Sequence, residues 1–226
     1  MAKQKNPTII VDGQEYLRIP IKTHIITDKD DIVEVADTYS KEKRQDGDII
    51  VISESVVAIT QGRALIESEI KIGLLAKILW RFVRKVPYGI GLRSPATMQC
   101  AINETGGMRI LAAAVLGGIT RLCGRRGDFY RIAGMQAALI DAAHTSPIPP
   151  YNNCVILGPK DPDKVASAIK AKTGCNAAIV DVNDIGGSWA IGLSDPTQKE
   201  SIQKIMKDNP LGQKDEQTPL GIIRKV

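Results

Sequence analysis

A run of four β-branched apolar residues, Ile49-Ile50-Val51-Ile52, constrains the fold of this 226-residue chain more than any other feature. The turn signal Gly47-Asp48 precedes the run, and no polar residue interrupts it. Such a run is typical of a strand that is covered on both faces, because a strand with one wet face alternates apolar and polar residues. The sequence therefore predicts a sheet with a buried central strand and further layers on either side.

Strand and helix patterns alternate along the rest of the chain, most clearly in its second half. Short apolar runs predict strands at residues 8–11, 16–21, 155–157, 177–180, 189–193 and 220–223. Longer periodic stretches predict helices at 162–172 and 196–207, a helix starting at 32–36, and a helix or strand at 56–59. This alternation predicts an α/β or mixed α+β fold.

Two segments in the middle of the chain carry helical or strongly apolar patterns. Residues 73–86 have apolar spacing that predicts a helix stopped by Pro87, with a basic face at Lys77, Arg81, Arg84 and Lys85. That face is interpreted as solvated surface, and a membrane or partner surface stays open. Residues 110–122 form the most apolar segment, which is too short to cross a bilayer and is predicted to be a buried helix or helix pair.

Composition and missing motifs exclude several functional classes. The net charge of +5 is spread along the chain, which suits anionic small molecules such as nucleotides but is too weak for a nucleic-acid surface. The four cysteines form no C-x-x-C pair, so reduced thiols are expected, and no signal peptide is visible, so we expect a cytoplasmic protein. The sequence contains no Walker loop, no G-x-G-x-x-G after a strand, no G-x-S-x-G and no H-E-x-x-H.

The first acidic cluster, Asp161-Pro162-Asp163, stands at the start of a predicted helix, where Pro suits the first turn. A carboxylate there can cap free backbone N–H groups, which explains one of the two acids. Two carboxylates between Lys160 and Lys164 also suit phosphate or metal binding. Both interpretations stay open.

The second acidic cluster, Asp181-Val182-Asn183-Asp184, directly follows the apolar strand predicted at residues 177–180. In α/β sheets ligands bind at the carboxyl ends of strands. Three oxygen-bearing side chains within four residues suit Mg²⁺ or Mn²⁺. A plain turn is an equal alternative, since Asn, Asp and the following Gly186-Gly187 are turn residues.

Several segments together carry a resemblance to one family. They are residues 18–23, 47–54, 61–63, 157–163, 181–183, 189–193 and 219–224, and they occur in the order expected of that family. In this order and at both ends of the chain, they resemble the γ-glutamyl ligase that adds glutamate to the deazaflavin coenzyme F-420. We therefore identify the chain, from residue 1 to 226, as resembling one γ-glutamyl ligase-like domain with an apolar helical insertion at about 96–128.

The resemblance implies an α/β fold of two interleaved subdomains and an intertwined homodimer. It implies an amide-forming ligase that uses GTP, or ATP, with Mg²⁺ or Mn²⁺ to activate a coenzyme or folate-like carboxylate as an acyl phosphate, which L-glutamate attacks. Its expected metal ligands are Asp141, Asp181, Asn183 and Asp184. Its expected nucleotide or substrate ligands are Arg63, Arg131, Lys160, Asp161 and Asp163. Residues 212–218 are the predicted closing loop, and no general base is evident.

The chain also departs from the family pattern. Gln136 stands where the family has a metal-binding acid, although Asp141 follows nearby, and Val182 replaces a threonine. These departures leave two alternatives open. One is another ligase or phosphoryl-transfer enzyme on the same scaffold with a different acceptor, and the other is a non-catalytic binding or membrane-associated relative that keeps the fold.

Overall fold

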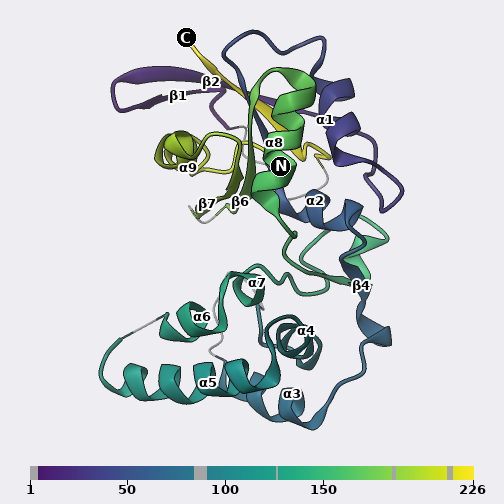
Figure 1. The fold of residues 1–226 in the computed structure, drawn as a ribbon, viewed down its shortest axis with the longest axis vertical. Coiled ribbons are helices and arrows are strands. Elements are labelled where there is room, and N and C mark those ends of the chain that lie inside the picture. The colour runs from purple at the N-terminus through teal and green to yellow at the C-terminus, as the bar shows by residue number, and fades with distance from the viewer. Residues whose placement is uncertain (1–4, 84–90, 126, 185–186, 213–215) are drawn as a thin grey trace. The chain divides into compact units, whose positions relative to one another are not determined.

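The computed structural model describes residues 5–83, 91–125, 127–184, 187–212 and 216–226. The chain divides into two compact units, which we describe separately. The first unit consists of Met1–Gln61 and Pro159–Val226, and the second of Gly62–Gly158 (Figure 1). Residues 96–128, predicted to be an insertion, all belong to the second unit, and their being an insertion stays a prediction.

The first unit is built on a sheet that has six strands within the described residues, in the order β1-β2-β8-β3-β6-β7. Only β3 and β6 run parallel, and every other neighbouring pair in this sheet is antiparallel. The strands are β1 Thr8–Val11, β2 Gln14–Ile21, β3 Ile49–Ser53, β6 Asn176–Val182, β7 Ser188–Leu193 and β8 Leu220–Lys225.

Strand β3 is the buried central strand that the apolar run predicted. Ile50 and Ile52 belong to the hydrophobic core on one face of the sheet, whereas Ile49 and Val51 belong to the core on the other. This alternation follows from the period of two in a strand, and it places apolar side chains in both layers. The prediction of a strand covered on both faces is confirmed.

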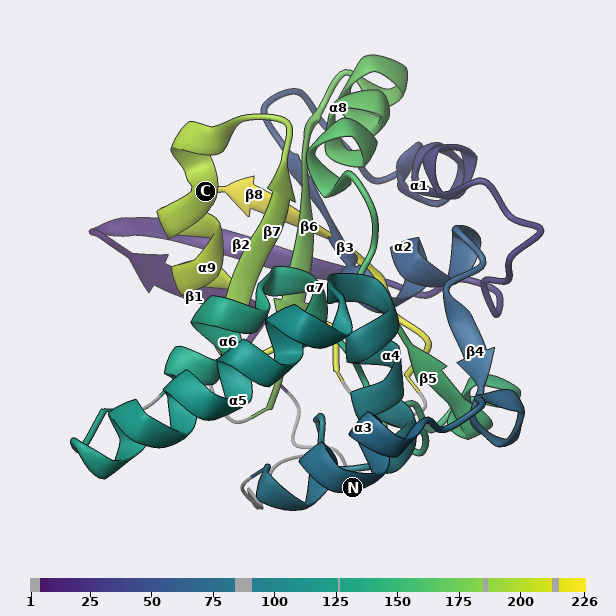
Figure 2. The same ribbon diagram turned by 60° about the horizontal axis from the view of Figure 1, so that its bottom comes forward.

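Helices cover both faces of this sheet (Figures 1 and 2). One core contains side chains from α1 Ile32–Ser40, α2 Glu54–Thr60 and α8 Pro162–Thr173, and the other contains side chains from α9 Lys199–Ile205, which follows the 3-10 turn η4 Pro196–Gln198. Local signals fix the helix ends: Asp31 caps α1 by accepting from the Val33 N–H at 2.8 Å, and Gly174 ends α8 with a left-handed φ of 79°. The mixed α and β fold is therefore as predicted.

The second unit is mainly helical. Its helices are α3 Leu74–Leu79, α4 Pro95–Thr105, α5 Gly107–Leu122, α6 Asp128–Ala133 and α7 Met135–Ala138, with 3-10 turns η1 Glu67–Glu69, η2 Trp80–Phe82 and η3 Tyr151–Asn153. Strands β4 Ala64–Ile66 and β5 Cys154–Ile156 pair antiparallel. The core gathers around α4, whose Met98 and Ala101 are fully buried.

Two predictions for this unit need correction. The segment 110–122 is one helix, α5, but it is not buried: only Ile110 and Ala113 are, because α5 packs along one side against its neighbours. The predicted helix 73–86 is shorter, since α3 ends at Leu79 and η2 at Phe82, and residues 84–86 lie outside the described part. The four cysteines are unpaired, as expected, and Cys123 is exposed.

Candidate functional site

The candidate site in the first unit lies where the parallel strands β3 and β6 end. Ser53 of β3 is in register with Val180 of β6, so the residues after them, Glu54 and Asp181, stand at the same carboxyl edge of the sheet. Parallel strands bring their carboxyl ends together, and this edge is where α/β sheets bind ligands. Asp181 was predicted to follow its strand directly, and it is instead the last residue but one of β6, at the carboxyl edge of the sheet.

Asp181 is the most unusual carboxylate in this unit. The residue is partly buried, and no hydrogen bond or ion pair reaches its carboxylate group from the described residues. Burial raises its pKa from 3.8 to about 6. A carboxylate that loses water without gaining a cation is held in an unfavourable charged state, which a bound cation would relieve.

Asn183 has its side chain occupied within its own turn. Its Oδ1 accepts from the Gly187 N–H at 2.8 Å, and its own N–H donates to the Gly187 carbonyl at 3.0 Å. A Cβ on Gly187 would lie 2.5 Å from the Asn183 amide nitrogen, so the close approach requires glycine. Asn183 therefore closes the connection between β6 and β7, as the turn interpretation expected.

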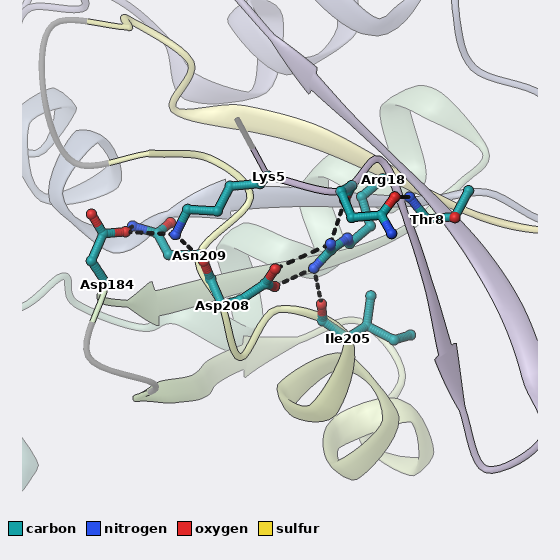
Figure 3. A network of polar contacts seen from close by, with 8 residues as sticks. Lys5, Thr8, Arg18, Asp184, Ile205, Asp208 and Asn209 are labelled. Carbon is teal, nitrogen blue, oxygen red and sulfur yellow. Dashed lines mark hydrogen bonds and ion pairs between the residues drawn. The ribbon is translucent and has the colours of Figure 1, made fainter. Parts of the chain in front are cut away.

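Asp184 faces the N-terminal segment and the connection after α9 (Figure 3). Its Oδ1 accepts from the Lys5 ammonium at 3.1 Å and from the Asn209 amide at 3.2 Å. The neighbouring Asp208 forms an ion pair with buried Arg18, whose guanidinium also donates to the Ile205 carbonyl at 3.0 Å (Figure 3). A lysine thus supplies Asp184 with a positive charge, in contrast to Asp181.

These contacts decide how a divalent cation would fit. Asp181 fits as a ligand because no cation among the described residues compensates the charge of its carboxylate. The oxygens of Asn183 and Asp184, in contrast, already accept hydrogen bonds. Within the described residues, no three His, Cys, Asp or Glu side chains gather closely enough to hold a metal ion. The cluster therefore offers one strong ligand, with the others committed to the fold.

The first acidic cluster lies at the start of α8, and its two carboxylates also have different partners. Asp161 adopts a left-handed φ of 46°, does not cap the helix with its side chain, and pairs in solvent with Lys164 at 3.2 Å. Asp163 instead accepts from the Leu193 N–H of β7 at 2.8 Å. Lys160 exposes its side chain, and its N–H donates to the Gln61 side chain at 2.8 Å. The predicted cap is therefore wrong for Asp161, while Asp163 ties the helix to the sheet.

In the second unit, Arg63 is buried and held from several sides. Its Nε donates to the Gly158 carbonyl at 2.6 Å, and its terminal nitrogen contacts Glu104 and, at 3.3 Å, the Gln136 oxygen. Gln136, which stands in place of an expected acid, thus accepts from this guanidinium. Arg63 organises the interior of the unit through these three acceptors.

The two remaining predicted residues also belong to the second unit. Arg131 is in the last turn of α6, is 71% exposed and pairs with Asp128 at 3.0 Å. Hydrogen bonds from Arg125, more than any other contact, lower the pKa of Asp128. The backbone of Asp141 bridges to Ile156 in both directions, at 2.8 and 3.0 Å, which extends the pairing of β5.

Sequence reasoning did not select Glu54, Lys5 or Glu104. Glu54 is buried and directly follows β3, with one residue between it and the apolar run, much as Asp181 follows the apolar run of β6. That shared pattern could have identified it. Lys5 and Glu104 gave no signal, because their partners Asp184 and Arg63 lie far away in the sequence.

Comparison with known families gives a family for the chain, and the helices of the structure were compared with the requirements of a membrane span. Among the described residues, no helix has both the length and the apolar content needed to cross a bilayer. The family model described as F420-0:Gamma-glutamyl ligase matches residues 20–195, a range that contains β3, β6 and both acidic clusters. Because this match covers well over half of the chain, the protein belongs to the F420-0:gamma-glutamyl ligase family.

Proposed function

We propose that this protein forms a γ-glutamyl amide bond between L-glutamate and a carboxylate of a deazaflavin coenzyme or folate-like acceptor, with GTP or ATP and Mg²⁺ or Mn²⁺. The observation that supports this most is Asp181, a desolvated carboxylate at the carboxyl edge of β3 and β6 that pairs with no cation among the described residues. Membership of the family supports the amide-forming reaction itself.

The chemistry needs two displacements. An oxygen of the acceptor carboxylate attacks the γ-phosphorus, the nucleoside diphosphate leaves, and an acyl phosphate forms. The amine of glutamate then attacks the carbonyl carbon, inorganic phosphate leaves, and the amine proton passes to solvent or base. A divalent cation would neutralise the phosphate charge that otherwise repels the attacking carboxylate.

Individual residues of this chain are proposed to bind the metal, the phosphate groups and the substrate. We propose Asp181 as the principal metal ligand, and Asp141 as a predicted ligand in the second unit. Asn183 and Asp184 would join only by exchanging their present hydrogen bonds. The exposed cations Lys160 and Arg131 suit phosphate or substrate carboxylate, with Asp161 and Asp163 beside Lys160. Within the second unit, Arg63 would support ligand binding through its buried contacts.

Further proposals concern the oligomeric state of the protein, its location and the closure of the site. We propose a homodimer that acts in the cytoplasm, with residues 212–218 closing over the acyl phosphate to exclude water. Residues 213–215 of this loop lie outside the described part, and Gln217 holds one end by accepting from the Thr23 N–H at 3.0 Å. Sedimentation equilibrium of the purified chain tests the dimer.

Calorimetry with GTP, ATP and Mn²⁺ tests the proposed function. We expect nucleotide binding that needs the metal and that Asp181→Ala weakens by at least about tenfold, since it removes a charged ligand. Glu200→Ala is the matched control, because it removes an exposed carboxylate that has no role in the proposed site and should leave metal-dependent nucleotide binding unchanged. Failure of both nucleotides to bind with Mn²⁺ contradicts the proposal.

A second experiment identifies the acceptor. Glutamate-dependent release of phosphate from GTP or ATP is measured with deazaflavin and folate acceptors in parallel. The proposed reaction requires release that depends on both glutamate and one acceptor.

The second candidate function is a non-catalytic binding protein that keeps the fold, and Gln136 is the observation that favours it. Its amide accepts from Arg63 where the family pattern has a metal-binding acid. Metal-dependent nucleotide binding without any glutamate-dependent phosphate release, with every acceptor, would support this candidate over the ligase.

A further inference from the structure

The outward side of α5 is apolar along its whole length. Met108, Leu111, Val115, Ile119 and Leu122 are all exposed, and their spacing of three or four residues places them on one side of the helix. We call these five residues the α5 outer face. Met108 is 82% and Leu122 90% exposed, so none of the residues that the structure describes covers either end of this face.

The opposite side of α5 is apolar as well and packs inside the unit. Ile110 and Ala113 are fully buried there. A Cβ on Gly117 would lie 3.1 Å from the backbone of Phe129, which shows how closely α5 approaches α6. A helix that is apolar on two opposite sides is normally covered on both. The described residues of this unit cover only the inner side of α5, so its outer face is available to a further apolar layer.

A second exposed apolar row lies on the neighbouring helix of the same unit. Leu74, Ile78 and Phe82 follow a four-residue spacing along α3 and η2, and all three are exposed. Leu75 of α3 packs against the start of α5, since a Cβ on Gly107 would meet it at 3.3 Å. Figures 1 and 2 show α3 and α5 at the same edge of their unit.

The surroundings of these helices are strongly basic. Residues 70–135 contain eleven Lys and Arg and two acids, Glu104 and Asp128. Both acids are already engaged, Glu104 by Arg63 and Asp128 by Arg125 and Arg131. The exposed cations Lys77, Arg81, Arg109 and Arg121 form no ion pair within the described residues.

This charge decides between the possible occupants of the α5 outer face. A second copy would bring the same cations against the first, with no uncommitted acid between residues 70 and 135 to meet them. An anionic bilayer supplies both an apolar layer and negative charge. We propose that the α5 outer face docks on anionic lipid bilayers, with α5 lying in the plane of the interface and Lys77, Arg81 and Arg121 at the headgroups. The Arg109 guanidinium is already held by the Ile132 carbonyl, to which it donates at 2.7 Å. This proposal does not depend on the ligase activity.

Co-sedimentation of the full chain with vesicles tests the proposal. The vesicles consist of phosphatidylcholine alone or mixed with phosphatidylglycerol. We expect at least about tenfold stronger binding to the anionic vesicles, because the basic residues near the surface are attracted to negatively charged headgroups. We also expect this binding to fall as salt is raised.

Two variants separate the α5 outer face from unspecific adhesion. The triple variant Leu111→Gln, Val115→Gln, Ile119→Gln changes only exposed residues and should lose at least about tenfold in binding, with an unchanged circular dichroism spectrum. Ile10→Gln is the matched control, an exposed apolar residue of the first unit that should leave binding unchanged.

Three outcomes would overturn the proposal. They are equal binding to neutral and anionic vesicles, unchanged binding of the folded triple variant, and no vesicle binding by a parent dimer that the triple variant dissociates in sedimentation equilibrium. The last result would assign the α5 outer face to a second copy. A several-fold loss in the variant Lys77→Gln, Arg121→Gln supports the electrostatic part of the interaction.

Discussion

The two compact units differ in which apolar and charged residues they bury. The first unit buries its most apolar run, β3, on both faces. It also partly buries a carboxylate, Asp181, which pairs with no cation in the described part of the chain. The second unit exposes most of its most apolar helix, α5, and buries a cation, Arg63, among three acceptors. An apolar run is therefore buried only when other segments cover it, and a buried charge stabilises or destabilises according to its partners.

The largest expected change in the free energy of unfolding concerns Arg63, the buried cation of the second unit. Arg63→Ala leaves the Glu104 carboxylate and the Gly158 carbonyl without their donor, so we expect a loss of about 3–5 kcal/mol in the free energy of unfolding. Urea unfolding measures this loss. Arg131→Ala is the control, since an exposed pair contributes at most about 1 kcal/mol. Similar losses for both variants would remove the contrast between buried and exposed arginines.

The next effect tests the buried run of the first unit. Ile52 is fully buried in the core beside α2 and α8, so Ile52→Ala should cost about 3 kcal/mol through lost contacts and a cavity. Ile52→Val removes one methylene and should cost about 1 kcal/mol. Thermal or urea unfolding checks both, and a cost near zero for Ile52→Ala would show that β3 is not covered on this face.

The strands and helices of the first unit could be predicted because their signals are local. The apolar run of β3, the capping Asp31 and the Gly174 stop each act over a few residues. Strand order could not be predicted in this way. Strand β8 pairs with β2 and β3, which are far away in the sequence, and no short pattern in β8 specifies these partners.

The candidate site was predictable to the same extent. Asp181 was found because it ends a buried strand, but the commitment of Asp184 to Lys5 and Asn209 depends on distant segments. The burial of α5 was predicted wrongly for a related reason. Its composition shows that the helix is apolar, and only the packing shows which side is covered.

A smaller effect tests the buried carboxylate of the first unit. The pKa of Asp181 is raised to about 6 in the folded state, above its unfolded value of 3.8. The folded chain therefore holds the proton more tightly, and this residue's contribution to stability is lost as the pH rises from about 4 through 6. We expect Asp181→Asn to be more stable than the parent by about 1–2 kcal/mol at pH 7, and equally stable near pH 4.

Urea unfolding from pH 4 to pH 8 without divalent cations measures this difference. Asp161→Asn is the control, because Asp161 is exposed and should show no such trend. A parent chain whose stability rises between pH 4 and pH 6 relative to Asp181→Asn would mean that a cation of the protein already compensates Asp181.

The smallest effect on stability tests the exposed helix of the second unit. Leu111 and Val115 on the α5 outer face are exposed, so Leu111→Ala and Val115→Ala should change the free energy of unfolding by less than about 0.5 kcal/mol. Ile110→Ala, on the opposite side of the same helix, should cost about 3 kcal/mol because Ile110 is fully buried. Equal costs on the two sides in dilute solution would mean that the outer face is already covered, by a second copy of the chain. A difference confined to Ile110 would leave that face available to a bilayer.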